Sequence, residues 1–240
     1  MRYKIELSYV GTDFHGWQKQ PNAITVQQTI EDAILLLFKQ VIELVGCGRT
    51  DTGVHAKYYV AHFDSDFEFD YNHIFKLNCY LPKSISITSI EKVGNDFHAR
   101  FSAKKRSYEY VITLKKSPFL VGFSWYVPFD LDIELMNNAA AILLDYCDFS
   151  SFSKLHTDVK TNNCKIFEAK FEVKDDMLIF NITADRFLRN MVRAIVGTIV
   201  EVGRKKITIE DFINIIEGKN RCLAGQSAAA EGLCLVGVGY

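Results

Sequence analysis

The segment GCGRTDTGVHAKYYVAHF, residues 46–63, concentrates side chains that can do chemistry. Arg49, Thr50, Asp51 and His55 supply a cation, a hydroxyl, a carboxylate and an imidazole between two apolar stretches. In a plain hairpin, Asp51 would favour a turn, the glycine two residues on would supply a positive φ, and Arg49 would only balance charge. In a catalytic loop, the same turn would present the Asp51 carboxylate to a substrate. Two features elsewhere in the chain favour the second interpretation.

The first feature is the stretch KRSYEYVI, in which Tyr108 and Tyr110 alternate along a predicted strand. Alternate residues of a strand lie on the same face of a sheet. One tyrosine can therefore belong to the core while the other serves as a stacking surface beside the preceding cations.

The second feature is an arginine-bearing helix predicted to begin at Arg186. Arg186, Arg189 and Arg193 recur at spacings of three and four residues, which places them on one helix face. A solvated face is the simple interpretation. Apolar residues flank Arg193 on the helical wheel, however, so we expect Arg193 to be largely buried, and a buried guanidinium needs an anionic partner.

Several segments resemble known ligand-binding motifs and lack residues that those motifs require. The glycines near the C-terminus precede no helix that could receive a pyrophosphate, and DSDFEFD, residues 64–70, lacks the glycine and the distal glutamate of a calcium loop. Its period-2 pattern instead predicts a strand or edge with Phe67 and Phe69 inward. His55 and His62 near Cys47 lack a second pair of ligands, so no metal site is predicted.

The composition is that of a folded protein. The 240 residues are 48% hydrophobic, with 28 basic and 29 acidic side chains and a formal net charge of −1. This balance weakens a nucleic-acid hypothesis without excluding it, because basic clusters are local. Six cysteines occur without a close pair, which favours reduced thiols, and no signal-peptide or membrane-spanning pattern is found. We expect a soluble cytoplasmic protein that does not contact a membrane.

The pattern of elements predicts a mixed α/β (α+β) fold with a mainly antiparallel sheet. Apolar alternation predicts strands at residues 2–10, 41–47, 58–63, 84–93, 107–114, 164–173, 177–184 and 234–240. Helices are predicted from Thr25 through Phe38, over 71–81, 131–145 and 186–202, and after Thr208, which is capped with Asp211. A soft boundary near residue 105 divides the chain into subdomains 1–105 and 106–240.

Taken together, seven motifs resemble the TruA family of tRNA pseudouridine synthases, in the family's order and over almost the whole chain. They are FHGWQKQ (14–20), GRTDTGVHA (48–56), FHARFSA (97–103), RSYEY (106–110), DFSSF (148–152), FLRNMVRAIVG (187–197) and EGLCL (231–235). The resemblance implies the pseudouridine synthase fold, with two similar subdomains that share an extended sheet and flank a central cleft.

The resemblance also implies a reaction and its residues. Uridines at positions thirty-eight to forty of the tRNA anticodon arm would be isomerised to pseudouridine, without a cofactor or metal. Asp51 matches the catalytic aspartate, as nucleophile or base at the ribose. Arg193 matches its basic partner, Tyr108 matches the tyrosine that packs on the uracil, and Arg49 is expected to help extrude the nucleotide.

Further RNA-contact candidates are His98, Arg100, Trp17 and Gln18, although a structural role is about equally expected for each. Family members are homodimers in which one tRNA contacts both subunits. Such a dimer would let basic clusters of two chains line one groove.

Two other function classes compete with the isomerase. A glycoside or nucleoside hydrolase would normally need a second carboxylate, and this loop offers Asp51 alone, whereas the acids at 64–70 are predicted to be solvated. A catalytically silent tRNA-binding or folding factor would keep the basic and aromatic surfaces and would not need Asp51.

Overall fold

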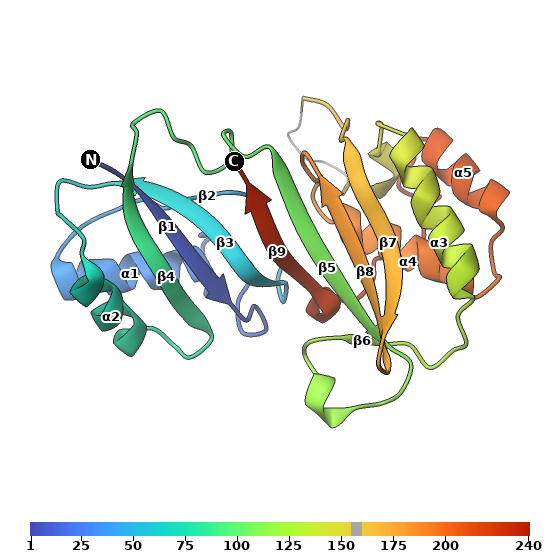
Figure 1. The fold of residues 1–240 in the computed structure, drawn as a ribbon, viewed down its shortest axis with the longest axis horizontal. Helices are drawn as coiled ribbons and strands as arrows, with labels where there is room; N and C mark the ends of the chain where they lie inside the picture. Colours follow the sequence, from blue (N-terminus) through green and yellow to red (C-terminus); the bar gives the residue numbers. More distant parts are fainter. Residues whose placement is uncertain (155–159) are drawn as a thin grey trace. The chain divides into compact units, whose positions relative to one another are not determined.

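The protein is described by a computed structural model that covers residues 1–154 and 160–240. Figure 1 shows its helices and strands in chain order. Contacts along the backbone divide the chain into two compact units. The first consists of residues 1–104 together with 234–240, and the second of residues 105–233.

The first unit is built on antiparallel strands with β1 (Arg2–Tyr9) in the middle. β1 pairs with β3 (His55–Asp64) on one side and with β4 (Ile85–Val93) on the other. Its inward residues Tyr3, Ile5, Leu7 and Tyr9 are at most 4% exposed, which confirms the predicted alternation. The short strand β2 (Val45–Gly46) pairs with β3 as an antiparallel hairpin partner.

The last strand, β9 (Leu233–Gly239), adds to the first unit by pairing parallel to β3, with His55 opposite Cys234. The backbone N–H of Lys104 also donates to the carbonyl of Gly239 at 2.7 Å. These long-range bonds place residues 234–240 in the first unit, whereas the predicted division kept them in the second subdomain.

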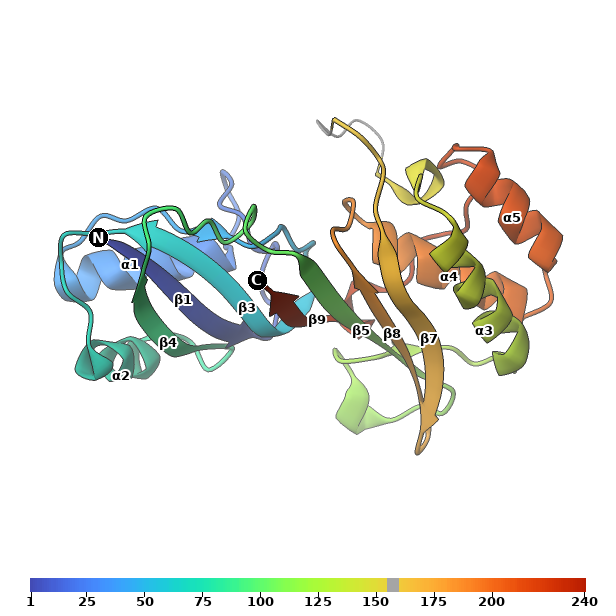
Figure 2. The ribbon, with the colours of Figure 1, turned by 45° about the horizontal axis from the view of Figure 1, so that its top comes forward.

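Two helices pack against the sheet of the first unit (Figure 2). α1 (Val26–Phe38) begins at Thr25, whose side chain accepts the backbone N–H of Gln28. α2 (Tyr71–Tyr80) begins at Asp70, which shares a reciprocal capping box with His73. Both helices were predicted, α1 from the cap at Thr25 and the apolar stripe that follows it, and α2 over residues 71–81 without its cap.

The second unit contains the antiparallel strands β5 (Lys105–Thr113), β8 (Met177–Ala184) and β7 (Ile166–Lys174), in that order. A two-residue strand, β6 (Trp125–Tyr126), pairs parallel to β5. The helices are α3 (Ile133–Ile142), α4 (Met191–Gly203) and α5 (Ile209–Glu217), which pack together beside β7 and β8 (Figures 1 and 2). Short 3₁₀ helices occupy Pro118–Leu120, Leu143–Asp145, Ser150–Phe152 and Ala230–Gly232.

The mixed α/β class and the mainly antiparallel pairing of strands are confirmed. The predicted strand at 41–47 is wrong for its first half, because only Val45–Gly46 pairs with a neighbour. Residues 65–70 form no strand, although Phe67 and Phe69 turn inward to stack around Phe38 and the acids are exposed as predicted. The predicted alternation of inward and exposed side chains is therefore confirmed for this segment, whereas the predicted strand is wrong.

The predicted helix 186–202 begins five residues late, at Met191. Asn190 has a left-handed φ of 66°, which breaks the helix before Met191. The Asp185 carboxylate accepts the backbone N–H groups of Lys165 and Arg186 at 2.8 and 2.7 Å, which holds the preceding segment in a loop. Arg186 therefore does not share a helix face with Arg193, and that prediction was wrong.

Among the residues that the structure describes, no helix is long and apolar enough to cross a membrane.

Candidate active site

The loop that carries Asp51 connects β2 to β3 and spans residues 47–54. Gly53 has a φ of 81°, as predicted for this turn, and the N–H of Val54 donates to the carbonyl of Asp51 at 3.2 Å. The side chain of Asp51 is half-buried. The hairpin interpretation is thus right about the backbone, and it leaves open what the carboxylate does.

A second loop of the first unit, residues 11–20, braces the Asp51 loop. The N–H of Gly53 donates to the carbonyl of Phe14 at 3.3 Å. Gly16 combines a φ of 82° with close approach, because a Cβ there would lie 2.3 Å from the carbonyl oxygen of Thr50. Only glycine satisfies both demands, so the two loops can pack backbone against backbone.

Hydrogen bonds of side chains also hold the Asp51 loop in place. The hydroxyls of Tyr9 and Thr50 lie 2.8 Å apart, and the N–H of Gly11 donates to Nδ1 of His55 at 2.9 Å. The Tyr59 hydroxyl donates to the carbonyl of Gly48. Thr50 and His55 therefore help to hold the loop, and the backbone on both sides of Asp51 is fixed.

Trp17 lies beneath this loop rather than on the surface. Its ring stacks on Tyr59 with 4.1 Å between ring centroids, and its side chain is 3% exposed. This burial favours the structural role that competed with RNA contact. Gln18, the next residue, is exposed and accepts a hydrogen bond from Nε of Arg49 through its Oε1. Arg49 and Gln18 thus form a polar pair on the surface beside the Asp51 loop.

His98 and Arg100 lie on the connection between β4 and β5, residues 94–104. Nδ1 of His98 accepts the N–H groups of Arg100 and Phe101, both at 3.2 Å, so the imidazole shapes its own turn. The Arg100 guanidinium is exposed and lies 5.6 Å from the ring centroid of Phe101.

Tyr108 lies on β5 of the second unit, opposite Ile182 of β8. Its half-buried ring meets Phe187 edge-on, with 5.2 Å between ring centroids and an interplanar angle of 90°. Tyr110, on the same face, is fully buried, and its hydroxyl donates to the carbonyl of Ala229 at 2.7 Å. Burial raises the pKa of the Tyr110 phenol far above its usual value. The predicted division between a core tyrosine and a more accessible one is confirmed.

Arg193 lies in the first turns of α4 and is half-buried. Its Nε donates to the carbonyl of Ala228 at 2.8 Å, while the N–H of Ala228 donates to the carbonyl of Arg193 at 2.9 Å. The segment around Ala228 can approach α4 because residue 197 is glycine. A Cβ at Gly197 would lie 1.9 Å from the carbonyl oxygen of Gln226.

The predicted site residues are thus distributed over both units. Asp51, Arg49 and Gln18 gather around the braced loop of the first unit, and Tyr108 and Arg193 belong to the second. Phe187 beside Tyr108 was not predicted as part of the site. It lies in a loop, where periodicity carries no signal, and only its place in the FLRN motif could have drawn attention to it.

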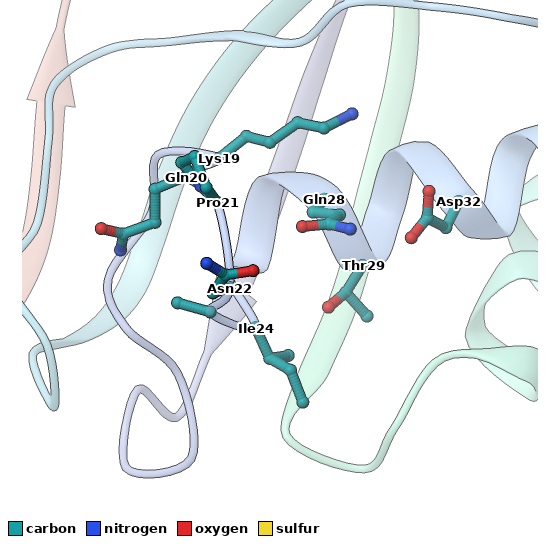
Figure 3. A pocket seen from close by; sticks show the side chains of 9 residues that line it. Lys19, Gln20, Pro21, Asn22, Ile24, Gln28, Thr29 and Asp32 are labelled. Carbon is teal, nitrogen blue, oxygen red and sulfur yellow. The ribbon is translucent and has the colours of Figure 1, made fainter.

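A hollow of about 670 Å³ lies elsewhere in the first unit (Figure 3). It is lined by residues 19–24 and by Gln28, Thr29 and Asp32 of α1. None of the predicted catalytic or RNA-contact residues lines it.

The histidines near Cys47 have structural roles that explain them without a metal. Nδ1 of His55 accepts the N–H of Gly11 and Nδ1 of His62 accepts the N–H of Ala99 at 3.1 Å.

Known proteins are similar to this chain over its full length. A family model described as tRNA pseudouridine synthase matches residues 7–102 and 139–240. These ranges include Asp51 and Arg193, whereas Tyr108 lies between them.

Individual relatives extend the similarity to whole sequences. A protein of Parabacteroides distasonis named tRNA pseudouridine synthase A is 52% identical over 100% of this chain and 96% of its own. Proteins of the same name from Bacteroides fragilis and Acetivibrio thermocellus are 50% and 42% identical, over 100% and 99% of this chain and 96% and 98% of theirs. The chain belongs to the tRNA pseudouridine synthase family.

Proposed function

We propose that this protein isomerises uridine to pseudouridine in the anticodon arm of tRNA, at positions thirty-eight to forty. The observation that carries the proposal is the braced loop around Asp51, in a chain that is 52% identical, along its whole length, to a protein named tRNA pseudouridine synthase A. A carboxylate on a turn that the loop at 11–20 holds in place is suited to act at a fixed point on a substrate.

The reaction balances without a co-reactant. The bond between C1′ of the ribose and N1 of uracil breaks, the base turns, and a bond forms between C1′ and C5. C5 then loses its proton, and N1 ends with one. Substrate and product have the same atoms and the same oxidation state, so the protein has to supply only a nucleophile or base, a site for the detached uracil and a path for one proton.

Asp51 is proposed to act at the ribose, either by forming a covalent adduct at C1′ or by removing a ribose proton along a glycal path. Either role requires the ionised carboxylate. The half-buried guanidinium of Arg193 is proposed as its cationic partner, since a neighbouring cation favours the charged form of a carboxyl group. The hydrogen bond from Nε of Arg193 to the carbonyl of Ala228 supports this role, because it restricts where the guanidinium can lie.

Tyr108 is proposed to pack on the uracil while the base turns. Its edge-on contact with Phe187 supports this role by restricting the ring. Its hydroxyl would then assist proton movement at C5. Arg49, paired with Gln18 on the surface, is proposed to replace or stabilise the extruded nucleotide, a step that costs a few kcal/mol of unstacking.

The same resemblance leads us to propose a homodimer that works in the cytoplasm. No disulfide joins the six cysteines, all of which lie among the described residues, and reduced thiols are typical of the cytoplasm. A dimer would also help explain how a chain with a formal net charge of −1 binds RNA, since basic clusters from two chains can line one groove. Sedimentation equilibrium tests this proposal by giving the mass in solution, and a monomer at all concentrations would contradict it.

One assay tests the proposed reaction. The protein is incubated with unmodified tRNA, and pseudouridine is mapped by carbodiimide-stop sequencing. Stops in the anticodon arm support the proposal. Release of free uracil would instead indicate a hydrolase, and tight binding without product would indicate a silent binder. The acids at 64–70 are exposed, and Asp64 is paired with Arg2 at 2.8 Å, so the second carboxylate that a hydrolase needs is not supplied there.

A further inference from the structure

Phe101 is an exposed aromatic side chain on a well-fastened loop. Its side chain is 77% exposed, at the end of the turn that follows β4. A single exposed phenylalanine on a protein surface is common and needs no explanation. What distinguishes Phe101 is the structure beneath it.

The turn under Phe101 is closed by its own hydrogen bonds. The N–H of Ser102 donates to the carbonyl of His98 at 2.9 Å, and the N–H of His98 donates to the Ser102 hydroxyl at 3.0 Å. Nδ1 of His98 accepts the N–H of Phe101 itself. The backbone at Phe101 is therefore fixed before any ligand arrives.

Longer-range bonds then tie this turn to the core of the first unit. Ala99, in the middle of the turn, donates its N–H to Nδ1 of the buried His62 at 3.1 Å. The carbonyl of Ala99 accepts the hydroxyl of Tyr240 at 2.9 Å. Arg2 donates to the carbonyl of Phe97 at 3.0 Å. Two strands, β1 and β3, and the C-terminal residue Tyr240 thus hold one short turn.

Aromatic rings continue from the core to the surface through this turn. The rings of His62 and His98 lie 4.7 Å apart, and those of His98 and Phe101 lie 4.3 Å apart with an interplanar angle of 37°. The Arg100 guanidinium lies 5.6 Å from the Phe101 centroid. An exposed aromatic ring on a fixed backbone, with a cation beside it, matches the chemistry of a nucleobase and its phosphate.

We propose that Phe101 is a stacking platform for an unpaired base of the substrate RNA, with Arg100 contacting the adjoining phosphate. This inference rests on the proposed function, since it assigns a further contact to the same tRNA substrate. Because the turn is already ordered, stacking costs little conformational entropy, and the gain is expected in binding rather than in the chemical step.

The test measures binding separately from turnover. Unmodified tRNA is titrated into protein that carries Asp51→Asn, so that no product accumulates, and Kd is measured with and without a second change. Adding Phe101→Ala should raise Kd about 5- to 100-fold, the range expected for one stacked base. Phe101→Leu should weaken binding similarly, because leucine fills space and offers no π-face, whereas Phe101→Trp should preserve or tighten it.

Phe75 provides a matched control, since it is a phenylalanine of the same unit with 62% exposure on the surface of α2. Phe75→Ala should leave Kd unchanged. Thermal melting of each variant separates a loss of stacking from a loss of folding. In Phe101→Trp, the new indole should be quenched by tRNA beyond the quenching of the native tryptophans, because a stacked base quenches indole fluorescence.

Two results would overturn the proposal: a Kd for folded Phe101→Ala within twofold of the parent, or equal Kd values for phenylalanine and leucine. Failure of the proposed function has a different signature. In that case the wild-type protein makes no pseudouridine on tRNA, whatever the Phe101 variants do to Kd.

Discussion

Asp51 shows how one residue depends on the backbone around it. Its turn is fixed by Gly53 on one side and by the contact of Gly16 with Thr50 on the other, so the carboxylate is presented from a rigid base. Such a fixed carboxylate suits the proposed reaction at a single ribose carbon, because small displacements of a catalytic group cost large factors in rate.

The first prediction concerns Asp51→Asn, which keeps the size of the side chain and removes its charge. Isomerisation should fall by at least about 10³-fold, equivalent to roughly 4 kcal/mol of transition-state stabilisation, while tRNA affinity stays close to wild type. Single-turnover rates and Kd measured on the same tRNA check both parts. Turnover near the wild-type rate would remove Asp51 from the mechanism.

A second prediction separates the ring of Tyr108 from its hydroxyl. If stacking on the uracil dominates, Tyr108→Phe should retain more activity than Tyr108→Ala, because Phe keeps the edge-on contact with Phe187. The measurement is kcat and KM for both variants with unmodified tRNA. Equal losses in Phe and Ala would assign the contribution of Tyr108 to its hydroxyl instead.

At the scale of helices and strands, the sequence predicts the features that depend on residues close together in the chain. The alternation in β1 and the caps at Thr25 and Thr208 act within a few residues, and the structure confirms each of them. The loop around Asp51 was identified from its residue types. Its bracing by the loop at 11–20 was not, because that contact joins segments more than thirty residues apart.

The start of α4 shows why local pattern fails elsewhere. Residues 186–190 have helical spacing of apolar and basic side chains, and the side chain of Asp185 captures the backbone N–H of Arg186 instead. The Asp185 carboxylate also accepts a hydrogen bond from the backbone N–H of Lys165, 20 residues away in sequence. A pattern read over a few neighbouring residues cannot predict such a contact. The parallel pairing of β9 with β3 could not be predicted either, because it also joins segments far apart in sequence.

Gly197 gives a prediction at the scale of α4 and the segment beside it. Gly197→Ala would place a Cβ 1.9 Å from the backbone carbonyl of Gln226, so the segment that bonds Arg193 must move. The expected loss is about 1–3 kcal/mol of unfolding free energy, although alanine is favoured over glycine in a helix interior by about 1 kcal/mol. Activity should fall by more than the loss of folded protein explains.

Gly48 supplies the control for this change. A Cβ at Gly48 meets no heavy atom within 4 Å, so Gly48→Ala should leave the free energy of unfolding nearly unchanged. Urea unfolding of both variants gives the comparison. If Gly197→Ala unfolds at the wild-type midpoint, the close packing of residue 226 on α4 does not contribute to stability.

At the scale of the whole molecule, the buried histidine under the Phe101 turn connects overall stability to pH. Burial is the main cause that lowers the pKa of His62 from 6.5 to about 4, and the neighbouring His98 and Arg2 add to it. Asp64 and a hydrogen bond to the backbone of Val45 act in the opposite direction and are weaker. His62 is therefore neutral in the folded protein throughout the neutral range.

The sign of the effect follows from proton uptake. Below pH 6.5 the imidazole of His62 is protonated in the unfolded protein, whereas in the folded protein it becomes protonated only near pH 4. The free energy of unfolding therefore falls as pH falls through this window. The full contribution is present above pH 6.5, and about 2 kcal/mol of it should be lost between pH 7 and pH 5.

Urea unfolding at these two pH values should show His62→Gln losing less stability than the wild type over the interval. His15→Gln removes an exposed histidine and keeps His62, so it should retain the wild-type loss. An identical loss in His62→Gln and wild type would show that other groups carry the acid sensitivity, and that the turn beneath Phe101 is not the acid-labile part of the fold.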